Sequence, residues 1–237
     1  MDLQKPLAGV VVVEFEAYPP LSLCGLMLAD HGATVIKVGS NRRMPVKDTL
    51  SKGKQTLLVN LKRTGGHRVP ELNSGVEYDL TELLSIFPNV DVVIESYRPG
   101  TMEKMNLGPA EVHQVNKNII YARLSGFGQT GKDSHLAGHD MTYLAKSGLF
   151  DLFRRYEQGD DPNGYQRDKP VIPWNIVADF MAGSYYLFTR IIQKLTEKKL
   201  GIFTKNVIDA SMTNDSAYLF KEILMKKNQQ SLDSHDL

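Results

Sequence analysis

Cysteine is almost missing from this chain. Cys24 is the only one among 237 residues, which excludes an internal disulfide framework and a metal cage built from several thiolates. Free cysteine is among the residue types most often buried, so we expect Cys24 to lie on a helix inside the protein. The scarcity of cysteine fits a reducing compartment.

The chain also lacks an excess of charge of either sign. It carries 28 Lys and Arg against 27 Asp and Glu, a formal net charge of +1. With so small a net charge, no overall field favours nucleic acid or an anionic membrane as the partner. The one basic cluster, between Arg42 and Arg63, fits either a site for a polyphosphate or a solvated face.

Long hydrophobic runs are missing as well. The first apolar run ends at Glu14, which makes it too short for a signal peptide or a membrane-spanning helix. The last three residues, His235-Asp236-Leu237, do not form a peroxisomal signal. We therefore predict an intracellular protein without a membrane span.

What the chain does contain is a series of short apolar or β-branched runs. These predict buried strands at Val10 to Phe15, Thr34 to Val38, Thr56 to Asn60, Asp91 to Glu95, Ile119 to Leu124 and Asn206 to Ile208. Helical spacing of apolar residues predicts helices over Leu21 to Ala29, Asp79 to Phe87, Ile176 to Lys199 and Ser216 to Lys226.

Strands that alternate with amphipathic helices are typical of an α/β fold. We predict a Rossmann-like, mostly parallel sheet with helices on both faces, formed by one large domain over residues 1–228 and followed by a polar tail, 229–237. Ligands bind such sheets beyond the carboxyl ends of the strands, so we expect the functional residues in the loops there. The segment from Tyr156 to Lys169 is rich in Gly, Asp, Pro and Arg and predicts a surface loop.

Two short motifs suggest other kinds of site. Gly126 to Lys132 has the glycine spacing of a nucleotide-binding loop, but Asp133 follows where a phosphate loop needs Ser or Thr, and no helix is expected to start at Gly131. His135 and His139 are spaced like two metal ligands on one helical turn, but no third ligand is obvious. We favour a tight glycine loop and no metal site.

A longer pattern is far more specific. The phrase ARLSGFGQTG, which begins at Ala122, is followed by LAGHD at Leu136 and YLA at Tyr143. This pattern resembles the class III coenzyme A transferase family, and within it the racemases. The likeness covers residues 7 to 225 in the right order, with further matches in LADHGA at Leu28, RPG at Arg98, VADF at Val177 and VIDASM at Val207.

The resemblance implies two catalytic residues. His139 matches the family's catalytic histidine and Asp179 its catalytic aspartate, while the backbone N–H of Asp140 matches the donor to an enolate oxygen. Inverting a carbon α to a thioester requires removal of its proton on one face and return of a proton on the other, so two acid/base groups must flank the carbon. A histidine titrates near neutral pH, whereas an aspartate must be tuned. The expected reaction is racemisation of 2-methylacyl-CoA thioesters.

The resemblance also implies how coenzyme A is held. The matching positions are Val59, Asn60, Leu61, Lys62, the phosphate-binding Arg98, and Gly138, Met141, Thr142 and Tyr143 at the pantetheine end. Arg42 lies close enough to replace the family's arginine after the second strand, which is Ser40 here. We expect no cofactor beyond the coenzyme A of the substrate and no metal. The family further implies an interlaced homodimer and a location in the peroxisome or mitochondrion.

Other functions stay open. Transferases of the family form a covalent anhydride between an aspartate and the acyl group, and Asp179 matches that aspartate too. His139 favours the racemase, because the transferases do not typically carry the Gly-His-Asp phrase. Relatives continue into a small domain, so we expect a shortened member, and a non-catalytic acyl-CoA binder is a further alternative. A nucleotide hydrolase would depend on Lys132.

Overall fold

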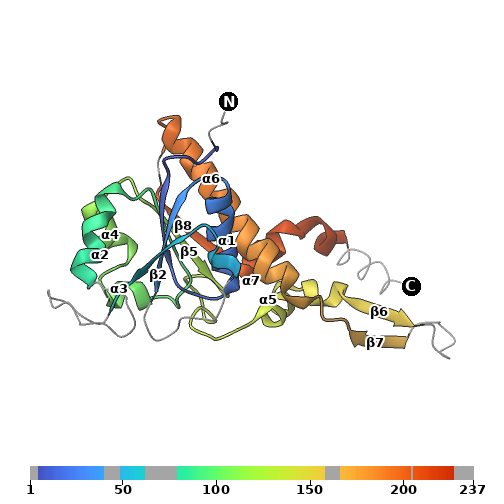
Figure 1. Ribbon diagram of the computed structural model, residues 1–237. Helices are drawn as coiled ribbons and strands as arrows, with labels where there is room; N and C mark the ends of the chain where they lie inside the picture. The colour runs from blue at the N-terminus through green and yellow to red at the C-terminus, as the bar shows by residue number, and fades with distance from the viewer. Residues whose placement is uncertain (1–4, 40–48, 62–78, 158–165, 204, 227–237) are drawn as a thin grey trace.

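Parallel strands form the centre of the protein. The computed structural model describes residues 5–39, 49–61, 79–157, 166–203 and 205–226. Its main sheet has six strands in the order β3-β2-β1-β4-β5-β8 (Figure 1). They are β1 (Val11–Phe15), β2 (Thr34–Gly39), β3 (Gln55–Leu58), β4 (Val92–Glu95), β5 (Ile120–Ser125) and β8 (Val207–Ser211). The predicted strands and the predicted mostly parallel α/β sheet are confirmed.

The strand order reverses in the middle of this sheet. From β1 the chain moves outward through β2 to β3, and it then returns to the other side of β1 with β4, β5 and β8. Val13 of β1 pairs with Ile36 on one side and with Val93 on the other. Such a reversal leaves a crevice beyond the carboxyl ends of the two central strands, which is where ligands of open α/β sheets bind.

Helices cover both faces of the sheet (Figure 1). Successive side chains of a strand point to opposite faces, so Val12 of β1 belongs to one core cluster and Val13 to the other. The first cluster is completed by α1 (Pro19–Asp30), α5 (Asp140–Ser147), η5 (Val177–Tyr185), α6 (Tyr186–Lys199) and α7 (Met212–Leu219). The second is completed by α2 (Leu80–Ile86), α3 (Thr101–Lys104) and α4 (Pro109–Val115). Cys24 is fully buried on α1, as predicted.

Short helical turns complete the described chain: η1 (Thr49–Ser51), η2 (Phe87–Asn89), η3 (Leu149–Leu152) and η4 (Trp174–Ile176). The start of α2 shows why the sequence folds as predicted there. A carboxylate oxygen of Asp79 accepts from the backbone N–H of Glu82 at 2.9 Å, and the Glu82 carboxylate accepts from the N–H of Asp79 at 3.0 Å. This reciprocal capping box satisfies two N–H groups that the helix leaves without partners.

The long helix predicted from Ile176 is not regular. Ile176 ends the turn η4, the nine residues Val177–Tyr185 wind as the π-helix η5, and α6 begins only at Tyr186. The wider winding brings the backbone of Gly183 close to Met212, whose Cγ would lie 3.3 Å from a Cβ at that glycine. Nine residues are too few for apolar spacing to distinguish the two kinds of helix. Wide turns of this sort occur frequently at functional sites.

Two further predictions are corrected. The helix predicted from Ser216 begins at Met212, because the hydroxyl of Ser211 accepts from the N–H of Asn214 and caps it. The surface loop predicted over Tyr156 to Lys169 is wrong at both ends, where β6 (Arg154–Glu157) and β7 (Gln166–Pro170) pair as an antiparallel ribbon. Pairing satisfies the backbone polar groups of a segment that extends away from the main sheet (Figure 1).

Some predictions cannot be compared with the structure, because the tail 229–237 and most of the basic cluster lie outside the described residues. Among the residues that are described, no helix is both long enough and apolar enough to cross a membrane.

Candidate active site

A cavity of about 600 Å³ lies beyond the carboxyl ends of the central strands. The loops after β1 and β4 and the end of β5 form one side of it, and the segments that lead into α5 and η5 form the other. Residues at its wall include Tyr18, Ser96, Tyr97, Arg98, Leu124, Ser125, Gly126, Leu136, Gly138, His139, Tyr143, Trp174, Asn175, Asp179, Phe180 and Met212. The cavity thus occupies the place that the reversal of strand order predicts for a ligand.

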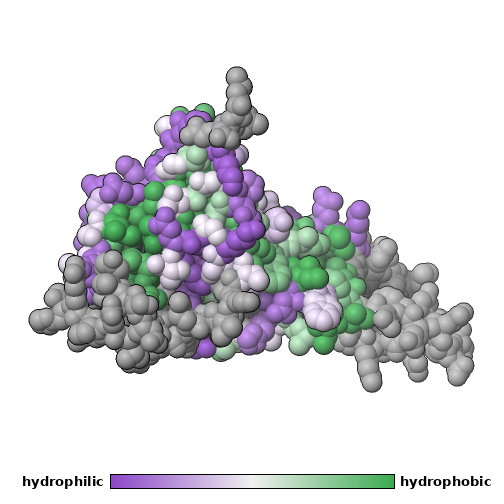
Figure 2. Space-filling view, in the orientation of Figure 1, coloured by the Kyte–Doolittle hydropathy of each residue, from purple (hydrophilic) through white to green (hydrophobic). Residues whose placement is uncertain are grey.

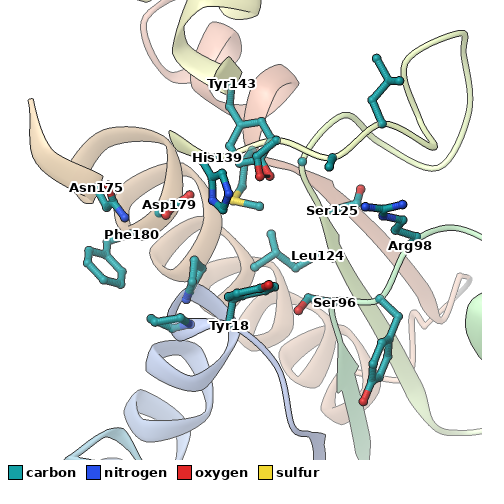
Figure 3. A pocket seen from close by; sticks show the side chains of 18 of the residues that line it. Tyr18, Ser96, Arg98, Leu124, Ser125, His139, Tyr143, Asn175, Asp179 and Phe180 are labelled. Atoms are coloured by element: carbon teal, nitrogen blue, oxygen red, sulfur yellow. Dashed lines mark hydrogen bonds between the residues drawn. The ribbon is translucent and has the colours of Figure 1, made fainter. Parts of the chain in front are cut away.

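His139 stands at this wall immediately before α5. Its backbone N–H donates to the hydroxyl oxygen of Thr142 at 2.8 Å, and that hydroxyl donates to the His139 carbonyl at 2.6 Å. These two bonds fix the backbone at the start of the helix and leave the imidazole at the cavity (Figure 3).

Tyr143 holds the loop that carries His139. Its hydroxyl donates to the carbonyl of Gly138 at 2.6 Å. Its ring lies so close to Gly126 and Gly138 that a Cβ there would sit 2.3 Å and 2.6 Å from the Tyr143 Cε1 atom. Glycine is therefore required at both positions by space, and Tyr143 brings the SGFG and AGHD phrases together.

Asp179 lies in the first turn of η5 beside His139 (Figure 3). The pKa of Asp179 is raised to about 6, mainly by burial and in addition by the neighbouring carboxylate of Asp140, while His139 acts in the opposite direction. A carboxyl group with a pKa so close to neutrality can both accept and release a proton at physiological pH. The side chain is well suited to general acid/base chemistry.

Asp140 connects the segment that carries His139 to the start of η5. Its side chain is only 1% exposed, and one carboxylate oxygen, Oδ2, accepts from the backbone N–H groups of Ala178 at 3.0 Å and Asp179 at 2.8 Å. Burial raises the pKa of Asp140, while these two bonds lower it. As the first residue of α5, Asp140 has a backbone N–H with no acceptor inside the helix.

The other predicted binding residues divide into two groups. Arg98, Gly138 and Tyr143 line the cavity, and Figure 3 shows Arg98 beside Ser125, on the side away from Asp179. The remaining described ones do not line it: Val59 is buried in the second core cluster, Asn60 and Leu61 follow β3, and Met141 and Thr142 are exposed on α5. Lys62 and Arg42 lie outside the described residues.

The glycine loop after β5 is a tight turn, as predicted. Gly128 and Gly131 adopt φ values of +88° and +96°, which favour glycine. The next helix begins only at Asp140, so the helix that a nucleotide-binding loop needs at Gly131 is missing. Among the described residues, no three His, Cys, Asp or Glu side chains gather as a metal site.

An aromatic part of the cavity wall was not predicted from the sequence. It is formed by Tyr18, which precedes α1, and by Trp174 and Phe180 from the consecutive turns η4 and η5. Trp174 is 80% exposed and has a φ of +53°, a value that is uncommon for a residue with a side chain. The single tryptophan of the chain, placed directly after Pro173, was the signal available for it.

Several known proteins resemble this chain in sequence or in fold. The family described as CoA-transferase family III matches residues 7–235. Alpha-methylacyl-CoA racemase is 38% identical over 214 residues in Mus musculus (90% of this chain, 49% of that protein) and 35% identical over 227 residues in Homo sapiens (95% and 53%). The crystal structure of Rv3272 from M. tuberculosis superposes with a TM-score of 0.71 at 27% identity, covering 95% of this chain and 58% of that one. The chain spans about half the length of the curated relatives it matches.

Proposed function

Because this chain belongs to CoA-transferase family III, we propose that it inverts the α carbon of 2-methylacyl-CoA thioesters. One observation carries the proposal: His139 and Asp179 lie next to each other at the wall of one cavity, and the pKa of Asp179 is raised to about 6. Two acid/base groups of different type at one site are what proton removal and return require.

The proposed reaction takes one proton from the α carbon and returns one to it, and proton exchange with solvent then restores the starting forms of Asp179 and His139. With one enantiomer, the Asp179 carboxylate takes the α proton, the C–H electron pair moves into the thioester as an enolate, and the His139 imidazolium returns a proton to the opposite face. With the other enantiomer the roles are exchanged. The enolate oxygen accepts from the N–H of Asp140, where the dipole of α5 also favours negative charge.

Binding of coenzyme A is proposed for the side of the cavity where Arg98 lies. A guanidinium group binds phosphate oxygens with two parallel hydrogen bonds. Gly138 and Tyr143 would meet the pantetheine end, since both line the cavity beside His139. The other positions with a family match, Val59, Asn60, Leu61, Lys62, Met141, Thr142 and Arg42, are proposed as contacts on the strength of the resemblance alone.

A transferase is the second candidate. The half-buried Asp179 lines the cavity and fits an acyl acceptor, which would form an anhydride and release the coenzyme A thiolate. A carboxyl group with a pKa of about 6 is mostly ionised at pH 7 and can act as a nucleophile or as a base, so the pKa of Asp179 does not separate the two candidates. His139 would have no role in that first step. A non-catalytic acyl-CoA binder is the third candidate.

The test is α-proton exchange in deuterated buffer. The purified chain is incubated with 2-methylacyl-CoA and exchange is followed by NMR, alongside His139→Ala, Asp179→Ala and Lys132→Ala. Exchange in the parent chain that is lost in the first two variants and kept in the third supports the racemase. Exchange that survives both active-site substitutions contradicts it, and binding without exchange supports the binder. Hydroxylamine trapping of an acyl group on Asp179 would instead support the transferase.

A homodimer is proposed as the assembly. Large apolar side chains are exposed on η5 and α7, among them Met181, Tyr185, Tyr218 and Leu219. Figure 2 shows apolar surface gathered over the region of α5 and α7. Exposed apolar area of this kind favours association. Sedimentation equilibrium should give twice the monomer mass, and Tyr185→Glu should reduce the measured mass.

Peroxisome or mitochondrion is the proposed location. It is to be tested with a tagged chain and markers of both organelles.

A further inference from the structure

The side chain of Asp140 has no role in the proposed reaction, which uses only its backbone N–H. Yet this carboxyl is almost completely buried and makes two hydrogen bonds to a segment nearly forty residues away. Its other oxygen, Oδ1, is buried and has no hydrogen-bond partner among the described residues. Burying a carboxylate with no cation beside it is costly.

A neutral side chain could make the same two bonds. The amide oxygen of Asn could accept from the same two backbone N–H groups. The first turn of η5 gains some stability from a negative charge, but that gain is small beside the cost of burial. Hydrogen bonding to η5 therefore does not explain why residue 140 carries a charge. The ionisable group that this charge faces is Asp179.

We propose that Asp140 is a positioning residue that joins α5 to η5, so that His139 and Asp179 keep a fixed spacing, and that its charge favours the protonated form of Asp179. The proposal deepens the racemase proposed above and rests on it for its catalytic meaning. The bond lengths of 3.0 and 2.8 Å to Ala178 and Asp179 fix the first turn of η5 directly.

The charged and titratable groups around Asp179 support the second half of the proposal. Asp140 from α5 raises the pKa of Asp179, and His139 lowers it. Tyr143 also faces this pair. Its pKa is raised to about 12 by burial first and then by Asp179, Asp140 and Tyr18. Tyr143 is thus neutral near pH 7 and adds no charge. The ionisation of Asp179 is set by burial and by the balance between Asp140 and His139.

The test compares Asp140→Asn, Asp140→Ala and a control, Asp133→Asn. Asp133 is a carboxyl in the loop before α5 that pairs with Lys146 at 2.6 Å, so its replacement removes the same charge nearby. The chain is labelled with ¹³C at the aspartate side chains, and the Asp179 resonance is assigned with Asp179→Asn. Its titration is then followed by NMR, a measurement that needs no activity.

We expect Asp140→Asn to lower the pKa of Asp179 by about one unit, while Asp133→Asn leaves it unchanged. In the exchange assay, the acidic limb of the pH profile should move by the same amount. Asp140→Ala should keep the fold, as circular dichroism would show, and lose about 100-fold in exchange rate, because misplacement of a catalytic group by about 1 Å costs that much.

An Asp179 titration that is the same in the parent and in Asp140→Asn would overturn the electrostatic role. Full exchange activity in Asp140→Ala would overturn the positioning role. If the parent chain shows no exchange at all, the proposed reaction fails while the NMR titration still decides whether Asp140 tunes Asp179.

Discussion

The carboxylate of Asp140 accepts a 2.8 Å hydrogen bond from the backbone N–H of Asp179, across 39 residues of sequence. Since His139 directly precedes Asp140, this one bond ties both candidate acid/base residues to each other. The other end of η5 is fixed to α1, because the hydroxyl of Ser184 donates to the Pro20 carbonyl at 2.7 Å. The spacing of the pair therefore depends on helix packing and not on a flexible loop.

Asp179→Asn should stabilise the protein at pH 7 but not at pH 4. The folded-state pKa of about 6 lies above the ordinary value of 3.8, so between these values the folded chain binds the proton more strongly than the unfolded chain. That contribution to stability is fully present below about pH 4 and is lost as the pH rises through 6. Asparagine stays neutral throughout, and we expect the Tm at pH 7 to rise by ~2 °C, measured by scanning calorimetry.

Asp133→Asn is the control for this prediction. The hydrogen bond from Lys146 lowers the pKa of Asp133, so its ionised form contributes stability above its unfolded-state pKa. Its replacement should leave the Tm at pH 7 unchanged or slightly lower. An equal rise in Tm for Asp179→Asn at both pH values would show that the effect comes from packing and not from ionisation.

Gly138→Ala should impair the site without unfolding the protein. A Cβ at this position would lie 2.6 Å from Tyr143 Cε1 and 2.7 Å from Thr142 Oγ1, so the segment that carries His139 must shift. We expect α-proton exchange to fall by about 100-fold. Gly131→Ala is the matched control, because that glycine has a φ of +96° but nothing within 4 Å of an added Cβ. Gly138 is not among the glycines with a positive φ, so an alanine there is crowded but not strained, and full activity in Gly138→Ala would contradict the prediction.

The sheet could be predicted from the sequence because its strands are buried on both faces. Val12 and Val13 are both fully buried, one in each core cluster, and such runs of apolar residues are typical of parallel strands. The π-helical winding of Val177–Tyr185 could not be predicted, since it depends on how Gly183 packs against Met212. The β6-β7 ribbon was missed because its strands are polar and short.

The candidate site was only partly accessible from the sequence. His139 and Asp179 were found through two phrases that resemble a known family, and the structure places both at one cavity. The role inferred for the Asp140 side chain depends on a hydrogen bond across 39 residues, which no local pattern encodes. The aromatic wall was missed for the same reason, because Tyr18 and Trp174 come to line one cavity only in the folded chain.

Glu14→Gln should destabilise the fold strongly. The Glu14 carboxylate accepts from Lys54 Nζ at 2.6 Å, and both side chains are fully buried. Removing one partner of a buried ion pair leaves an uncompensated charge, which costs about 3–5 kcal/mol of the free energy of unfolding. The double variant Glu14→Gln/Lys54→Met should recover part of this loss. Denaturant unfolding measures the free energy of unfolding of the single and the double variant. If Glu14→Gln is no less stable than Asp133→Asn, the prediction is contradicted.

Arg98→Ala should weaken the binding of coenzyme A while leaving the chemistry intact. The guanidinium lies at the cavity wall on the side away from Asp179 (Figure 3), where it would meet a phosphate and not the reacting carbon. Loss of one charge-assisted contact should raise the Kd about 10-fold in calorimetry and raise KM similarly, with kcat nearly unchanged. Lys132→Ala serves as the control, since a nucleotide-binding loop would require that lysine. Unchanged affinity in Arg98→Ala together with weakened binding in Lys132→Ala would move the phosphate site to the glycine loop.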